Sequence, residues 1–408
     1  MWLTRIFALA AFSIVPCYAF YDCPRARCET CLPANTYDAP GVGFDLTPSY
    51  GTSAVHYSNG TVVDVIQIPG KPEYLELMTR LAKGGKPVLI EDQGIFQSSY
   101  FKLFSLLDSF LGFPFPARAG WRWLNEMLKR PVEVDDITII SEMLRDLQLT
   151  TEKQILQGLN RVAITTPDIQ TLNSEMINSA LQELDLQPWT GDCPWYPRRL
   201  VEADAVYAAS GHGLCKNYHD LWQCTDEFEW ASSPTILFVS FTRQLLYTSI
   251  TTPIGGEALL RFAYDDMKFL DFELGLDRIL EADNPDLLWA RLREQIKRFS
   301  LSSEFRITGF LLAGESTTDP LFLTNLKDAL AGLSEPHIES KIVPFALMGS
   351  AQGENPIEKP MDLTFAAARG AALYARRRQE VQCDCSEPEE CTLLRQKERS
   401  DGQVKLDL

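Results

Sequence analysis

The sequence carries little positive charge. Its 38 Lys and Arg residues stand against 55 Asp and Glu residues, and the formal net charge over 408 residues is −17. Binding to nucleic acid needs clustered positive charge to neutralise phosphates, so the composition argues against a nucleic-acid partner. It also argues against attachment to anionic membrane surfaces. After the N-terminal segment no window holds the ~18 apolar residues that a membrane-spanning helix requires, and we expect no membrane span.

Sequence patterns of common hydrolases and metalloproteins are also missing. The chain has only four His residues, and it contains no G-x-S-x-G nucleophile elbow. His212 and His219 lie near Cys193, Cys215 and Cys224, so a zinc site is an alternative for this region. The spacing of these residues matches no familiar zinc pattern, and we therefore predict no metal site.

The N-terminus has the pattern of a secretory signal. Arg5 precedes the apolar run Ile6–Val15, and Cys17-Tyr18-Ala19 follows with small residues at both ends. This layout predicts a signal peptide over residues 1–19 that is cleaved after Ala19. We expect a secreted, extracellular protein, with the lumen of the endoplasmic reticulum as the alternative. The last four residues are not the K-D-E-L retention signal, so retention lacks support.

The remaining cysteines fit an oxidising compartment. They form three groups, in which clustered cysteines are expected to pair as disulfides: Cys23, Cys28 and Cys31; Cys193, Cys215 and Cys224; Cys383, Cys385 and Cys391. The odd number leaves one thiol unpaired. Asn59-Gly60-Thr61 is a glycosylation sequon. Because Asn-Gly also favours a hairpin turn, we expect Asn59 to be exposed and glycosylated.

Strand-like and helix-like segments alternate along the chain, which predicts an α/β fold. With 45% hydrophobic residues the chain can bury a substantial core. The predicted strands cover residues 43–57, 61–68, 162–165, 235–241 and 308–313, and the predicted helices cover 73–81, 100–111, 132–147, 172–184, 285–299, 321–330 and 365–377.

Five segments occur in an order that resembles one family. They are Gly43-Phe44-Asp45-Leu46-Thr47-Pro48-Ser49-Tyr50, Arg161–Pro167, Glu202–Ala209, Leu312–Pro320 and Ala366–Ala372. In sequence and order they resemble motifs of the actin-like ATPase superfamily, nearest to the nucleotide-binding domain of the seventy-kilodalton heat-shock chaperones. The first resembles the G-I-D-L-G-T-T-Y phosphate loop, and the fourth resembles the V-G-G-S-T-R-I-P adenosine motif.

The resemblance implies a two-lobed fold, a duplicated ribonuclease H-like architecture that closes on a nucleotide. The implied organisation is a Cys-rich leader at 20–40, lobe I at 41–230 with a Cys- and Trp-rich insertion at 187–233, lobe II at 231–362, a closing helix at 363–379 that returns to lobe I, and a polar tail at 380–408. The chaperones' peptide-binding domain is missing. Because the first strand and last helix of the family share lobe I, we expect at least one disulfide between the leader and the tail.

The phosphate loops that the resemblance implies are degenerate. Thr47 replaces a glycine, and Pro48 has no N–H to donate to an anion. The second loop should follow residues 235–239 as D-L-G-G-G-T, but it reads Val239-Ser240-Phe241-Thr242-Arg243-Gln244. Asp45 and Glu202 remain as vestigial catalytic carboxylates. The residues that match nucleotide-contacting positions are Asp45, Thr47, Ser49, Tyr50, Ser240, Thr242, Arg243, Gly255, Gly256, Gly314, Ser316 and Thr317.

Two classes of function follow. The first is a catalytically degenerate pseudo-ATPase that binds an unidentified protein or small ligand and needs no cofactor. The second is a nucleotide-binding ATPase or phosphotransferase of the secretory pathway that retains weak binding of ATP and magnesium. The loop losses favour the first class. The carboxylates Asp45 and Glu202, with Ser316 and Thr317, keep the second open.

Overall fold

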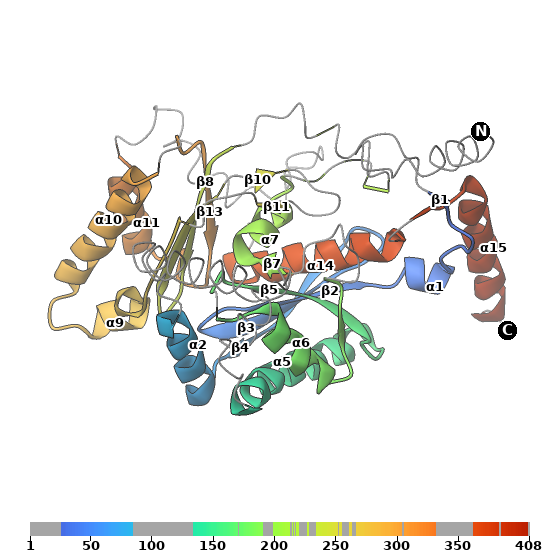
Figure 1. Ribbon diagram of the computed structural model, residues 1–408, viewed down its shortest axis with the longest axis horizontal. Helices are drawn as coiled ribbons and strands as arrows, with labels where there is room; N and C mark the ends of the chain where they lie inside the picture. The colour runs from blue at the N-terminus through green and yellow to red at the C-terminus, as the bar shows by residue number, and fades with distance from the viewer. Residues whose placement is uncertain are drawn as a thin grey trace, which may run out of the picture. The chain divides into compact units, whose positions relative to one another are not determined.

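We describe the protein from a computed structural model. It describes residues 26–84, 134–169, 171–190, 199–212, 214, 216, 218–219, 227, 234–251, 253–254, 261–262, 267–303, 306–331, 362–382 and 385–406. The chain forms two compact units. The terminal unit combines Met1–Asp38 with Gln379–Leu408, and the larger unit is Ala39–Arg378. Figure 1 shows the elements of both.

Two disulfides hold the terminal unit together. Strand β1 (Ala26–Arg27) pairs in parallel with β14 (Cys385–Ser386), and helix α1 (Ala34–Tyr37) contacts α15 (Glu389–Leu406). Disulfides join Cys28 to Cys385 and Cys31 to Cys391, which confirms the predicted link between leader and tail. The other predicted disulfide cysteines, Cys23, Cys193, Cys215, Cys224 and Cys383, lie outside the described residues.

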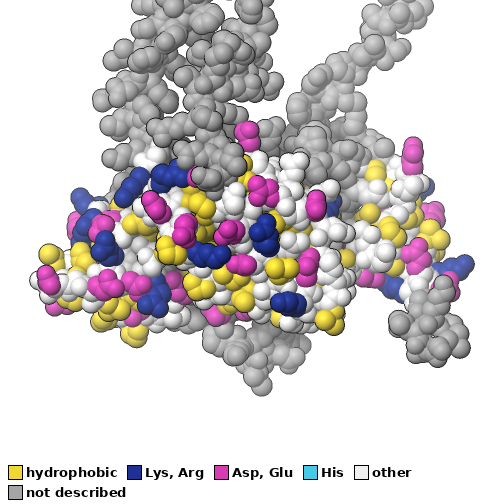
Figure 2. All heavy atoms as spheres, turned by 90° about the horizontal axis from the view of Figure 1, so that it is seen from below, with side chains coloured by type: hydrophobic (Ala, Val, Ile, Leu, Met, Phe, Trp, Pro, Cys, Tyr) yellow, Lys and Arg dark blue, Asp and Glu magenta, His cyan; other side chains and the backbone are white. Residues whose placement is uncertain are grey.

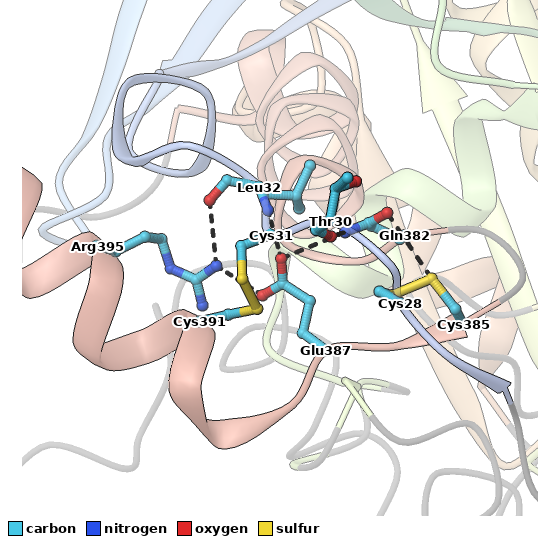
Figure 3. Close-up of a disulfide and its surroundings, with 9 residues drawn as sticks. All are labelled: Cys28, Thr30, Cys31, Leu32, Gln382, Cys385, Glu387, Cys391 and Arg395. Atoms are coloured by element: carbon cyan, nitrogen blue, oxygen red, sulfur yellow. Dashed lines mark hydrogen bonds and ion pairs between the residues drawn. A yellow bond between two sulfur atoms is a disulfide. The ribbon is translucent and has the colours of Figure 1, made fainter.

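Charged side chains support the disulfides of the terminal unit. The Arg395 guanidinium donates to the Glu387 carboxylate at 2.6 Å and to the Leu32 carbonyl at 3.3 Å (Figure 3). The same guanidinium lies 4.0 Å from the Tyr37 ring centroid. Glu387 in turn accepts the Leu32 amide at 2.6 Å. These bonds hold α15 in place, whereas the sequence predicts only a polar tail at 380–408, with no helix named there.

The first sheet of the larger unit begins with three antiparallel strands. They are β2 (Gly41–Leu46), β3 (Tyr50–His56) and β4 (Val62–Pro69). Strand β5 (Arg161–Thr166) pairs in parallel with β2, and the short strands β6 (Gln187–Pro188) and β7 (Leu200–Val201) pair in parallel with β5. The structure divides the predicted β-rich segment over residues 43–57. It is two strands joined by a turn at Thr47.

Three helices pack with the first sheet. They are α2 (Pro72–Gly84), α5 (Val134–Ile155) and α6 (Ser174–Gln182). Helix α2 buries Tyr74, Leu77, Met78 and Leu81, the i, i+3, i+4, i+7 pattern of an amphipathic helix. These side chains share a core with Leu144 of α5. The predicted helix at 100–111 lies outside the described residues.

The second sheet repeats the pairing of the first. Its strands are β8 (Ile236–Phe241), β9 (Leu246–Thr251), β12 (Met267–Asp271) and β13 (Gly309–Ala313). Strand β9 pairs antiparallel with both β8 and β12, and β13 pairs in parallel with β8. The order β12-β9-β8-β13 matches β4-β3-β2-β5 of the first sheet. Helices α9 (Leu276–Glu281), α10 (Pro285–Leu301) and α11 (Pro320–Leu330) follow these strands, and β10 (Pro253–Ile254) pairs with β11 (Arg261–Phe262). Two short 3₁₀ helices, η1 (Phe272–Leu274) and η2 (Leu363–Phe365), complete the second half.

Small residues let two helices and the first sheet approach closely. A Cβ at Gly43 of β2 would overlap the backbone of helix α14 (Ala366–Glu380), and a Cβ at Gly370 of α14 would overlap the carbonyl of Ala205 in helix α7 (Glu202–Ala209). Ala366 belongs to the core of the second sheet, whereas Ala368 and Ala372 pack on Ala54 of β3. Helix α14 thus connects the two cores, and it runs beside α7 in Figure 1.

The described side chains on one face of the molecule are of mixed type. On the face drawn in Figure 2, acidic, basic and apolar side chains are interspersed rather than segregated. Asn59 is exposed at the β3–β4 turn, where its Oδ1 accepts the Thr61 amide at 2.9 Å and Gly60 takes φ +84°. The predicted exposure of Asn59 is confirmed, and its glycosylation stays a prediction. Within the described ranges we find no helix with the length and apolar character to cross a membrane.

Candidate functional site

Two hairpin turns with the same design lie at the centre of the larger unit. The first joins β2 to β3. The Thr47 amide donates to the Tyr50 carbonyl at 2.9 Å, and the Thr47 hydroxyl donates to the same carbonyl at 2.9 Å. The Thr47 hydroxyl also accepts the amides of Ser49 and Tyr50, at 3.1 and 3.0 Å. The Thr47 side chain therefore forms hydrogen bonds with three backbone groups of its own turn.

The turn that joins β8 to β9 repeats this pattern. The Thr242 amide donates to the Leu245 carbonyl at 3.0 Å. The Thr242 hydroxyl lies 3.3 Å from that carbonyl and accepts the amides of Gln244 and Leu245, at 3.3 and 3.2 Å. The two turns meet directly, because the hydroxyls of Ser49 and Thr242 are 2.7 Å apart. This buried bond joins the first sheet to the second.

The turn amides are therefore occupied by groups of the chain itself. A phosphate cradle needs successive backbone N–H groups that point at the anion. Here the amides of Ser49 and Tyr50 donate to the Thr47 hydroxyl, and those of Gln244 and Leu245 donate to the Thr242 hydroxyl. Pro48 has no backbone N–H to donate. The Arg243 amide donates to a carboxylate oxygen of Glu315 at 2.8 Å. A side-chain carboxyl group thus occupies the donor that the second turn still offers.

Three carboxyl groups surround the junction of the turns. Asp45 is at the end of β2, 1% exposed, and accepts the Thr165 hydroxyl of β5 at 2.8 Å. Glu202 begins α7, 2% exposed, and accepts the Ser240 hydroxyl of β8 at 3.0 Å. Glu315 follows β13. Asp45 and Ser240 occupy equivalent positions, each two residues before the threonine of its turn.

Burial favours the protonated form of these carboxyl groups. Loss of water raises the pKa of Asp45 to about 7, against the lowering effect of the Thr165 hydrogen bond. Burial and then the charge of Asp45 raise the pKa of Glu202 well above its usual range. The pKa of Glu315 is also raised, mainly by burial. The pKa of the buried Tyr50 hydroxyl rises through burial and the charges of all three, so this ring lies within their field.

The loop after β13 is fixed by its own backbone. Gly314 has φ +101°, and a Cβ there would overlap the carbonyl of Phe241. The Ser316 amide donates to that carbonyl at 3.2 Å, and the Thr317 hydroxyl donates to the Gly314 carbonyl at 2.6 Å. Left-handed φ and close approach both require glycine here. The hydroxyl of Thr317, which the sequence assigns to adenosine binding, is used internally.

Most of the predicted site residues that the structure describes lie in or beside the two turns, where their polar groups bond to one another or to nearby backbone. Arg243 is an exception, since its guanidinium is largely exposed and pairs with Asp277 at 2.8 Å. Gly255 and Gly256 lie outside the described residues. Sequence reasoning missed the roles of Thr165 and Glu315. Thr165 lies opposite Asp45 in the parallel pair β2–β5, and a period-2 reading of the segment Arg161–Pro167 is the signal that would have found it.

A second polar cluster connects the same halves. Asp168, just after β5, accepts the Arg199 guanidinium at 2.6 Å and the Lys268 ammonium of β12 at 2.5 Å. Arg199 also donates to the carbonyls of Pro167, Ile169 and Leu172. Nearby, burial and then the charge of Asp168 raise the pKa of Asp204 well above its usual range. The described part of the chain holds no group of three or more His, Cys, Asp or Glu placed to bind a metal ion.

Comparison with known proteins identifies no family for this chain. No protein-family model matches the sequence, and no curated protein matches it. The site must therefore be interpreted from its own geometry.

Proposed function

We propose that this is a secreted protein with a two-lobed, actin-like ATPase fold whose nucleotide site is closed by its own side chains. In this interpretation the protein is a pseudo-ATPase that acts by binding a protein partner or a small ligand. The observation that carries the proposal is the occupation of the turn amides by Thr47 and Thr242. Phosphoryl transfer depends on positioning and charge stabilisation, and both need those donors free.

Two features of the larger unit support the choice of fold. The two sheets share one strand order and one pairing pattern, as a duplicated ribonuclease H-like architecture requires. The residues that resemble the family's loops meet between the sheets through Ser49 and Thr242. Secretion rests on the N-terminal segment and on the two disulfides, which are typical of oxidising compartments.

One observation favours a second candidate, a nucleotide-binding ATPase or phosphotransferase of the secretory pathway. Asp45 and Glu202 lie together at the turns, as the family's catalytic carboxylates do. Burial raises the pKa of both groups, so a cation that bound here would have to displace protons from them. The surrounding hydroxyls of Thr165 and Ser240 are also committed to the two carboxyl groups.

Thermal unfolding with added ligands separates the two candidates. We expect no change in the melting temperature with magnesium and ATP or ADP at millimolar concentration. A nucleotide present at 100 times its Kd would instead add about 2.7 kcal/mol to the free energy of unfolding. A saturable shift that is lost in Asp45→Asn would support the nucleotide-binding candidate. A panel of simple sugars, screened in parallel, tests the small-ligand branch.

A further inference from the structure

Among the described residues, the carboxyl groups at the junction between the two sheets are hydrogen-bonded to hydroxyls and a backbone amide rather than to cationic side chains. Ser49 of the Ser49–Thr242 hydroxyl pair follows Asp45 in the first turn, and Thr242 follows Ser240, which donates to Glu202. The charge of Asp45 is a cause of the raised pKa of Glu202, second to burial. Glu315 also raises the pKa of Glu202, so three acids from β2, α7 and the loop after β13 share one buried space.

The groups that face these acids are hydroxyls and acids rather than bases. Thr165 of β5 and Ser240 of β8 each donate one hydrogen bond. Burial, and after it the charge of Asp45 among others, raises the pKa of the phenols of Tyr50 in β3 and Tyr74 in α2. Arg243, in the second turn, is the cation that acts on the cluster. It lowers the pKa of Glu315, while its guanidinium is held at the surface by Asp277.

A polar atom beside Asp45 has no hydrogen-bond partner. Thr52 lies directly across from Asp45 in the β2–β3 pair, and its side chain is fully buried. The Thr52 hydroxyl oxygen makes no hydrogen bond. It therefore donates no bond to Asp45, and the hydrogen bond that this carboxyl accepts comes from Thr165. A buried, ionised carboxylate needs more donors than this to replace its lost water. The arrangement of neighbours therefore suits the neutral acid.

We propose that the junction of the two sheets is a proton-dependent latch, closed while Asp45 and Glu202 are protonated and loosened when both ionise. Two buried carboxylates in one space repel each other and lack water to solvate them, so ionisation favours any opening that admits water. The turns at Thr47 and Thr242 begin two residues after Asp45 and Ser240, so they are the first backbone to respond. This proposal does not depend on the identity of the ligand or on the pseudo-ATPase assignment.

The sign of the pH effect follows from linkage. A group whose pKa is higher in the folded state binds protons on folding, so stability falls as the pH rises through that pKa. For Asp45 the window runs from its ordinary value of 3.8 to about 7. Most surface carboxyls have finished titrating at pH 5.5, so a fall between pH 5.5 and 8 reports mainly on raised groups.

Thermal unfolding of the full mature chain at pH 5.5 and pH 8 tests the latch. We expect the melting temperature to fall by at least about 5 °C at the higher pH. The double variant Asp45→Asn with Glu202→Gln mimics the protonated pair and should lose most of this fall. Glu142→Gln, which removes an exposed carboxyl that pairs with Lys71, is the control and should keep it. Equal melting temperatures in the parent, or an unchanged fall in the double variant, would overturn the proposal.

Local hydrogen exchange distinguishes a latch from a general loss of stability. With rates corrected for intrinsic pH dependence, the amides of Tyr50 and Leu245 should lose more protection at pH 8 than those of Leu292 in α10. A uniform loss over all three amides would contradict a latch. If the double variant does not fold, Asp45→Asn alone must reduce both effects by a measurable fraction, and failure to do so counts against the proposal equally.

Discussion

At the residue scale, two threonine side chains occupy the backbone N–H donors of the two turns. Thr47 and Thr242 each accept two amide N–H groups and approach one carbonyl, and Thr242 also meets Ser49. A hydroxyl has one donor and two acceptor positions, so each side chain is close to saturated. Buried polar groups are stable only when they are hydrogen-bonded. The same contacts that stabilise the turns therefore remove the donors that an anion would use.

Substitution of Thr242 should measure this contribution. Thr242→Val keeps the shape but leaves the amides of Gln244 and Leu245 and the Ser49 hydroxyl without their partner. Because unpaired buried groups cost free energy, we expect the free energy of unfolding to fall by roughly 1–3 kcal/mol in denaturant titration. Thr324→Val is the control, since the Thr324 hydroxyl bonds to a carbonyl of its own helix at an exposed position. Equal losses in both variants would contradict the role assigned to Thr242.

At the element scale, helix α14 organises the larger unit through small residues. Gly43 and Gly370 let it approach β2 on one side and α7 on the other, and α7 carries Glu202. Alanines at 368 and 372 continue the same close packing against Ala54. The position of α14 therefore helps fix Glu202 relative to Ser240 of the second sheet.

Gly370→Ala tests this packing. Alanine is favoured over glycine in a helix interior by about 1 kcal/mol, but the added Cβ would overlap the backbone carbonyl of Ala205. Backbone cannot yield as a side chain can, so we expect a net loss of roughly 1–3 kcal/mol in the free energy of unfolding. Gly158→Ala, where a Cβ meets nothing within 4 Å, should leave stability almost unchanged. A stabilised Gly370→Ala variant would show that α14 has room to shift.

Sequence periodicity predicted most elements but failed where closure depends on distant groups. The helices α2, α10 and α11 follow from apolar spacing, and β5, β8 and β13 from buried β-branched and apolar runs. The resemblance indicated a loop at Thr47, but it did not show that the Thr47 hydroxyl bonds the backbone of that loop. Helix α15 was missed because it lacks an apolar face and is held by Cys391 and Arg395 against the leader.

The carboxyl cluster shows the same limit more sharply. Asp45, Glu202 and Glu315 are far apart in sequence, and their proximity depends on both sheets being in place. The family resemblance indicated Asp45 and Glu202, whereas it assigned no role to Glu315. Its contact with the Arg243 amide has no sequence pattern, because any residue can supply a backbone N–H.

At the scale of the whole molecule, each of the two units has bonds that join segments distant in the sequence. In the terminal unit, two disulfides join segments that are 357 and 360 residues apart in sequence. Within the larger unit, the Ser49–Thr242 bond and the Lys268–Asp168 ion pair connect the halves that carry the two sheets. Disulfides of this kind are typical of proteins in oxidising compartments. Catalytic opening and closing would have to break the internal bonds of the junction.

Steady-state release of phosphate from ATP in the presence of magnesium tests the central claim most directly, with the purified mature protein and its Asp45→Asn variant side by side. The account predicts the same background rate for both, because the turn amides are occupied and removing even one preorganised donor costs about 10²–10³ in rate. Turnover by the parent protein that the Asp45→Asn variant abolishes would contradict the account and establish the ATPase candidate.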